Sequence, residues 1–201
     1  RRQRQMCIRD RPTVVLIGDS IRMGYQPFVT EALAGEAEIW APEENGGDSR
    51  NVLAHLEAWV IARAPHAVHV NCGLHDVKKS FETSVAQVPL AEYEENVRRI
   101  LTVLSSLEGT QVVWASTTPV DEKLHHANKG FDRFEADVDA YNRCARSLCR
   151  SLGIEVHDLF AVVEGIGRRE ILREDGVHFT EVGSRLLGGS VASCVRRCLT
   201  K

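Results

Sequence analysis

The sequence predicts an α/β fold in which a doubly wound, five-stranded parallel sheet is covered by helices on both faces. Five short apolar runs alternate along the chain with stretches of helical periodicity, which is the order of a parallel sheet with crossover helices. The runs are nearly continuous in apolar residues, as expected for strands buried on both faces. At 201 residues, with 43% hydrophobic and 26% charged residues, the chain has the length and composition of one globular domain.

The amino-terminal half contributes three of the expected strands. The first, residues 13–17, ends at Gly18, which permits a sharp turn after it. Apolar residues at helical spacing then predict a helix over residues 21–34, with an irregular first turn because Gly24 and Pro27 interrupt the pattern. The next expected elements are a strand at residues 37–41, a polar glycine loop at 42–49, a helix with its apolar stripe at 52–63 and a strand at 67–71.

The carboxy-terminal half repeats the alternation, which completes a single-domain, flavodoxin-like three-layer sandwich. Its expected elements are a helix at residues 90–107, a strand at 111–116, a helix at 138–152, a strand at 154–157, a partly helical stretch at 158–173 and a last helix at 180–199. In the last helix, the residues expected to face inward are Val182, Leu186, Leu187, Val191, Val195 and Leu199. Residues 117–130 are predicted to be the longest irregular segment, in which His125 and His126 are expected to be solvated.

Residues 1–11 differ in composition from the rest of the chain. They are basic and almost free of apolar side chains, so we expect them to lie outside a domain that covers residues 12–201. They lack the apolar centre of a signal peptide; a cytoplasmic location is the expectation, with loss of a natural leader as the alternative. The six cysteines form no C-x-x-C pair, which favours free thiols in a reducing compartment over a metal site.

Charge and hydropathy argue against several classes of partner. A net charge of −3 gives no reason to expect nucleic acid, and no apolar run is long enough for membrane insertion. No glycine-rich phosphate-binding loop follows the first strand, which argues against a flavin or nucleotide cofactor. The sequence leaves the oligomeric state open.

Two short motifs carry the candidate chemistry. Ser20 follows the first strand, and Asp175 precedes His178 by three residues in a loop before the last helix. A serine hydroxyl needs an imidazole to take its proton, and the imidazole needs a carboxylate to fix its tautomer. Each motif alone also suits a helix cap or a solvated turn. Parallel strands bring their carboxyl ends to one edge, however, where Gly47 and His75 are expected too, and this favours a single site.

These blocks, in this order, resemble the SGNH hydrolases, also called GDSL-type esterases and lipases. The resemblance spans residues 13–199 and rests on Gly18-Asp19-Ser20, Gly46-Gly47-Asp48-Ser49, Gly73-Leu74-His75-Asp76 and Asp175-Gly176-Val177-His178. It implies ester hydrolysis through an acyl-enzyme, without a metal or an organic cofactor. Ser20 would be the nucleophile, His178 the general base and acid, and Asp175 the residue that orients His178.

The resemblance also implies an oxyanion hole built from the Ser20 N–H, the Gly47 N–H and the side chain of residue 75, with Gly46 as an alternative to Gly47. Residue 75 is a histidine in this chain, whereas the family usually has an asparagine there. An imidazole N–H in the right tautomer is also a donor, so we favour His75 over the other candidate, Asn71.

The predicted activity is the hydrolysis of small acyl esters, and family analogy favours an acetyl ester on a carbohydrate. The expected partner is therefore a small-molecule or carbohydrate ester, with substrate contacts from Arg22, Asn71 and Asp76. One alternative is acyl transfer to an alcohol or a sugar. Another, motivated by His75, is a non-catalytic descendant that binds carbohydrate or another ligand. A long-chain lipase or thioesterase ranks lower because no lid-like amphipathic segment is present.

Overall fold

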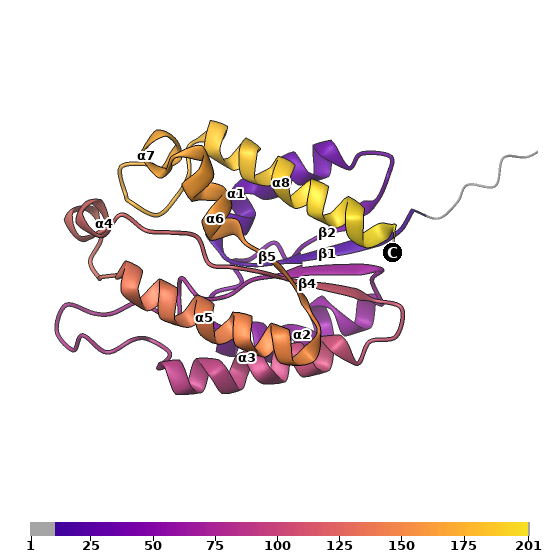
Figure 1. Cartoon of the computed structure of the whole chain (residues 1–201), viewed down its shortest axis with the longest axis horizontal. Helices are drawn as coiled ribbons and strands as arrows, with labels where there is room; N and C mark the ends of the chain where they lie inside the picture. The colour runs from indigo at the N-terminus through magenta and orange to yellow at the C-terminus, as the bar shows by residue number, and fades with distance from the viewer. Residues whose placement is uncertain (1–10, 201) are drawn as a thin grey trace, which may run out of the picture.

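The computed structural model describes residues 11–200 and shows a three-layer α/β sandwich around a parallel sheet (Figure 1). The strand order is β2-β1-β3-β4-β5, which confirms the flavodoxin-like arrangement. The strands are β1 (Thr13–Ile17), β2 (Glu38–Trp40), β3 (Ala67–Val70), β4 (Gln111–Ala115) and β5 (Glu155–His157). The expected extension, residues 1–11, lies outside the described residues except for Arg11.

Helices cover both faces of the sheet, as predicted. Helices α1 and α8 pack against each other on one face, and α2, α3 and α5 form the layer on the other (Figure 1). The helices are α1 (Ser20–Ala32), α2 (Ser49–Trp59), α3 (Leu90–Ser105), α4 (Glu122–Asn128), α5 (Glu135–Leu152), α6 (Leu159–Ile166), α7 (Arg168–Ile171) and α8 (Glu181–Leu199), with a 3-10 turn at Ile61–Arg63. Within residues 11–200, no helix is both long and apolar enough to cross a bilayer.

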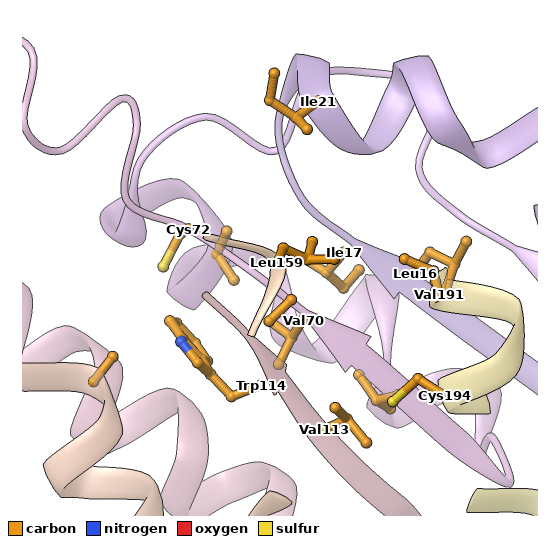
Figure 2. Packing of buried hydrophobic residues seen from close by; sticks show 14 of the residues in the cluster. Leu16, Ile17, Ile21, Val70, Cys72, Val113, Trp114, Leu159, Val191 and Cys194 are labelled. Atoms are coloured by element: carbon orange, nitrogen blue, oxygen red, sulfur yellow. The ribbon is translucent and has the colours of Figure 1, made fainter. Parts of the chain in front are cut away.

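The central strands are buried on both faces, because helices pack on each side of them. Every residue of β1 after Thr13 is fully buried. Side chains of β1 and β4 lie together with those of α8, among them Leu16, Val113, Val191 and Cys194 (Figure 2). Burial on two faces requires a continuous apolar run, which is why the strands could be recognised in the sequence.

The segment 117–130 differs from its prediction. It is not wholly irregular, because α4 occupies its centre and is capped by Asp121, whose side chain accepts the Leu124 N–H at 3.0 Å. His125, expected to be solvated, is fully buried. Helix α1 is also more regular than predicted, since it runs unbroken from Ser20 through Pro27.

The inward face of α8 agrees with the prediction only in part. Leu187, Val191 and Val195 are buried, as predicted. Val182 and Leu186 are 65% and 45% exposed rather than buried. Helix α8 turns small residues toward α1 instead: a Cβ built on Gly188 would lie 2.6 Å from the Cβ of Phe28. Close packing of two helices therefore decides which side of α8 faces inward, and hydrophobicity alone does not.

Three buried histidines, His69, His125 and His157, are held as neutral rings. His69 Nε2 and His157 Nδ1 lie 3.0 Å apart, and His157 Nε2 lies 2.9 Å from Ser190 Oγ. His125 Nε2 accepts a hydrogen bond from Arg133 Nη1 at 3.0 Å. Burial lowers the pKa of His69 to about 3 and those of His125 and His157 to about 4.

The cysteines in the described part of the chain are free thiols, as expected. These are Cys72, Cys144, Cys149, Cys194 and Cys198. Burial raises the pKa of Cys72 well above that of an ordinary thiol, so it packs as a small apolar side chain. Cys7 lies outside the described residues.

Candidate active site

The turn after β1 places Ser20 at the carboxyl end of the sheet, as the first residue of α1. Asp19 caps the helix, because its Oδ1 accepts the Ile21 N–H at 2.9 Å. Gly18 leaves no room for a side chain, since a Cβ there would lie 2.7 Å from the Cβ of Arg22. The sequence of this turn therefore fixes where the Ser20 hydroxyl lies.

Ser20, His178 and Asp175 form a continuous hydrogen-bonded chain. Ser20 Oγ lies 2.8 Å from His178 Nε2, and His178 Nδ1 lies 2.5 Å from Asp175 Oδ2. With Nδ1 protonated and bonded to the carboxylate, Nε2 is free to accept the serine proton. The structure thus brings together three residues that the sequence places at its two ends.

The loop that carries Asp175 and His178 is shaped by its own backbone. Asp175 Oδ1 accepts the N–H groups of Val177 and His178 at 3.1 and 3.0 Å, and Gly176 has a φ of +70°. Burial raises the pKa of Asp175, but hydrogen bonds from His178, Val177 and Lys129 outweigh it and hold that pKa well below the usual range. Asp175 is therefore a carboxylate throughout the neutral range.

The glycine loop before α2 offers one donor that can be freed. The Gly46 N–H donates to the Gly18 carbonyl at 3.0 Å, which ties it to the turn after β1. The Gly47 N–H donates to Asn45 Oδ1 at 2.8 Å, a side chain that can rotate away. Gly47, with a φ of +65°, is thus better suited than Gly46 to bind an oxyanion.

His75 lies in the turn shortly after β3, and it is half-buried. Its ring makes no hydrogen bond to any residue among 11–200, although Arg133 Nε fixes the preceding carbonyl, that of Leu74, at 2.5 Å. Burial lowers the pKa of His75, and the nearby Arg133 and Lys78 cations add to this effect against the opposing Asp19 carboxylate. A neutral ring keeps one N–H donor and carries no charge.

Arg22, Asn71 and Asp76, the expected substrate contacts, are directed into the protein. Their side chains are buried, at 2%, 9% and 0% exposure respectively, and each supports a loop of the site. Arg22 Nη2 donates to the Glu44 carbonyl at 2.8 Å, and Asn71 Nδ2 donates to the Ala115 carbonyl at 2.8 Å. Asn71 therefore has its amide committed to β4, which leaves the half-buried His75 ring as the candidate donor.

Asp76 holds the end of the glycine loop through the backbone of Ser49. Both of its carboxylate oxygens lie within 3.2 Å of the Ser49 backbone N–H, at the start of α2, and Asn96 Nδ2 donates to Ser49 Oγ at 3.0 Å. Burial raises the pKa of Asp76 to about 7, against the Ser49 hydrogen bonds that lower it. Asp76 thus links the loop of Gly47 to the loop of His75.

A serine hydroxyl, an imidazole, a carboxylate and two candidate oxyanion donors therefore lie at the carboxyl edge of the sheet. These are the parts that acyl transfer from an ester requires, and the edge is where doubly wound sheets bind ligands. Among residues 11–200, no group of three or more histidine, cysteine, aspartate or glutamate side chains is arranged to hold a metal ion. The fold and this arrangement indicate a hydrolase of the serine type.

Comparisons with known proteins agree with this class. The sequence model of the GDSL-like Lipase/Acylhydrolase family matches residues 16–186. The GDSL esterase/lipase CPRD49 of Arabidopsis thaliana is 28% identical over 203 aligned positions, which cover 92% of this chain and 79% of the relative. The chain belongs to the GDSL-like lipase/acylhydrolase family, a family of carboxylic ester hydrolases.

Solved structures share the fold at lower identity. A lipase/acylhydrolase from Enterococcus faecalis superposes with a TM-score of 0.77 at 22% identity, over 92% of this chain and 96% of that one. Axe2, an acetylxylan esterase from Geobacillus stearothermophilus, superposes with a TM-score of 0.72 at 19% identity, over 93% and 94% of the two chains. Both confirm an SGNH hydrolase-like α/β fold.

Two cations beside the site were not found from the sequence. Lys129 Nζ lies 3.1 Å from Asp175 Oδ2, and Arg133 connects the His75 loop to the buried ring of His125. Both belong to the segment around α4, which lies far from the site in sequence and carries no recognisable motif. Only the fold brings that segment onto the loop of Asp175.

Proposed function

We propose that this chain is a serine esterase that hydrolyses small acyl esters, with O-acetyl groups on carbohydrate as the preferred substrates. The observation that carries the proposal is the chain of contacts from Ser20 Oγ to His178 Nε2 at 2.8 Å and from His178 Nδ1 to Asp175 Oδ2 at 2.5 Å. This geometry lets one imidazole serve as base and then as acid.

The proposed reaction has two halves. Ser20 Oγ attacks the ester carbonyl while His178 Nε2 takes the hydroxyl proton, and the same proton passes to the leaving alkoxide, so that an alcohol and an acyl-Ser20 result. A water molecule then gives its proton to His178 and attacks the acyl-enzyme, which releases the carboxylic acid and returns the proton to Ser20. Asp175, held as a carboxylate, stabilises the imidazolium in both halves.

The oxyanion of each tetrahedral intermediate would be bound by three donors. These are the Ser20 N–H, the Gly47 N–H after Asn45 rotates away, and the ring N–H of His75. A neutral imidazole suits this task because it donates without having to lose or gain a proton, and the lowered pKa of His75 supports that state at neutral pH.

The acetyl–carbohydrate preference rests on likeness to enzymes of known substrate. Axe2 is described as an acetylxylan esterase, and another similar structure, AlAXEase, is described as an acetyl xylan esterase. Arg22, Asn71 and Asp76 are assigned to supporting the loops in this proposal, because they are buried. The alcohol part of the substrate would then be recognised by other residues.

The substrate proposal is tested by measuring acetate release from acetylated xylo-oligosaccharides, alongside hydrolysis of 4-nitrophenyl acetate, octanoate and palmitate. Acetate release with a kcat/KM that falls as the acyl chain lengthens is the expected result, and Ser20→Ala should abolish it. Preferred turnover of the palmitate ester would overturn the small-acyl assignment. Adding an alcohol acceptor and analysing the products separates hydrolysis from acyl transfer.

A further inference from the structure

Helix α4 is fastened to the loop that carries Asp175 and His178. The Asp121 N–H donates to the Gly176 carbonyl at 2.8 Å, and Asn128 Nδ2 donates to the Glu174 carbonyl at 2.9 Å. The two segments approach so closely that a Cβ on Gly176 would lie 2.5 Å from the Asp121 carbonyl oxygen. In Figure 1, α4 lies at the end of the molecule opposite the C-terminus.

Besides these two hydrogen bonds, a third contact joins α4 directly to Asp175. Lys129, the C-cap of α4, places Nζ 3.1 Å from Asp175 Oδ2, the oxygen that also lies 2.5 Å from His178 Nδ1. The Lys129 and Asp175 side chains are 29% and 21% exposed, so this ion pair is partly shielded from water. The Lys129 backbone N–H donates to the His125 carbonyl at 2.9 Å, which anchors the lysine to the helix end.

We propose that α4 holds this loop in place and that Lys129 is a positioning residue. Lys129 orients the Asp175 carboxylate and sets the pH range in which His178 can act as a base. This inference rests on the Ser20–His178–Asp175 mechanism proposed above. The ammonium group touches neither the serine nor the imidazole, so its effect passes through Asp175.

Lys129 acts on Asp175 both by holding its position and by its charge. Asp175 Oδ1 is held by two backbone N–H groups, whereas the contacts of Oδ2 with residues 11–200 are those to His178 and Lys129, so the lysine fixes the carboxylate while the imidazole exchanges its proton. The ammonium charge also offsets part of the carboxylate charge. Without it, the imidazolium is more stable and gives up its proton at a higher pH.

Other charged groups near Asp175 do not provide the same control. His125 and Arg133 interact electrostatically with Asp175 from the α4 side. Burial lowers the pKa of His125 to about 4, so its ring stays neutral where an esterase works. Burial lowers the pKa of Arg133 to about 10, so its charge is constant over the same range. Lys129 is therefore the cation in direct contact with Asp175, and its replacement tests whether that contact sets the pH range of His178.

The test compares Lys129→Met, Lys129→Arg and the control Lys123→Met, which removes the same charge from an exposed position of α4. The pH midpoint of the His178 ring is followed by two-bond ¹H–¹⁵N NMR, which needs no turnover. In Lys129→Met we expect this midpoint to rise by about 0.5–1 pH unit. Lys129→Arg and Lys123→Met should both stay near the wild-type value.

Kinetics supply a second readout. For a small ester, Lys129→Met should lower kcat by about 3- to 10-fold with KM unchanged, and the acid limb of its pH profile should move up with the NMR midpoint. A merely structural lysine would lower the melting temperature and leave the midpoint in place, which would overturn the inference. An equal shift in Lys123→Met would do the same. If the midpoint shifts in Lys129→Met but the wild-type chain has no esterase activity, the proposed function alone would be refuted.

Discussion

Replacing His75 with alanine is expected to lower kcat without weakening the fold. The His75 ring makes no hydrogen bond to the described residues and is only half-buried, so its removal leaves no buried partner unsatisfied. The free energy of unfolding should therefore change by less than about 1 kcal/mol. Any large loss of activity would then come from the reaction itself.

The size of the kinetic effect follows from the role assigned to the ring. Loss of one oxyanion donor costs about 2.7–4 kcal/mol of transition-state stabilisation, which corresponds to about 10²–10³ in kcat. KM should change little, because the donor acts mainly on the charge that develops in the transition state. His75→Asn restores an N–H donor and should retain activity to within about tenfold of the wild type.

The pH profile adds a check on this assignment. Since burial and the neighbouring cations lower the pKa of His75, the ring gains a proton only below its usual range, and it stays a neutral donor at higher pH. His75→Asn should therefore keep the acid limb of the wild-type profile. The assay is hydrolysis of 4-nitrophenyl acetate, with circular dichroism melting as the control. If kcat of His75→Ala lies within threefold of the wild-type value, His75 is not an oxyanion donor.

Two further predictions concern stability. The buried histidines stay neutral in the fold, with pKa values of about 3 and 4, but take up protons below about pH 6.5 when unfolded, so acid destabilises the protein. Asp76, with a pKa of about 7, acts oppositely, and urea titration should show a net loss of about 3 kcal/mol from pH 7.5 to 5.0; equal stability at both values would contradict this. Gly176→Ala forces a Cβ toward Asp121 at a φ of +70° and should cost about 2–4 kcal/mol and at least tenfold in kcat. Gly130→Ala is its control, because nothing within residues 11–200 lies near a Cβ at that position. Equal melting temperatures and kcat values for the two variants would contradict the proposal that α4 holds the loop in place.

The sheet could be predicted from the sequence because its signal is local. Strand β1 is a continuous apolar run that must be buried on both faces, and the length of α3 lets its apolar stripe recur several times. Helix α4 was missed because a helix of seven residues shows too few repeats of a pattern. The inward face of α8 was drawn too wide at Val182: the buried stripe of Leu187, Val191 and Val195 could be predicted, whereas the close contact of Gly188 with α1 could not.

The candidate site could likewise be predicted only where its residues lie close together in the sequence. Asp175 and His178 lie three residues apart, so a single loop brings them together and their spacing is visible in the sequence. Lys129 reaches Asp175 only through the fold of α4, and no local pattern records that contact. Arg22 and Asp76 were assigned to substrate because polar residues near a motif suggest contact, whereas their burial depends on loops that close over them.

The most direct test of Ser20 as the nucleophile is the intact mass of the protein after treatment with a fluorophosphonate, which phosphonylates an activated serine. We expect one adduct on the wild-type chain, mapped by peptide analysis to Ser20, and none on Ser20→Ala. A folded wild-type chain that forms no adduct, or an adduct that persists in Ser20→Ala, would contradict the assignment of Ser20 as the nucleophile.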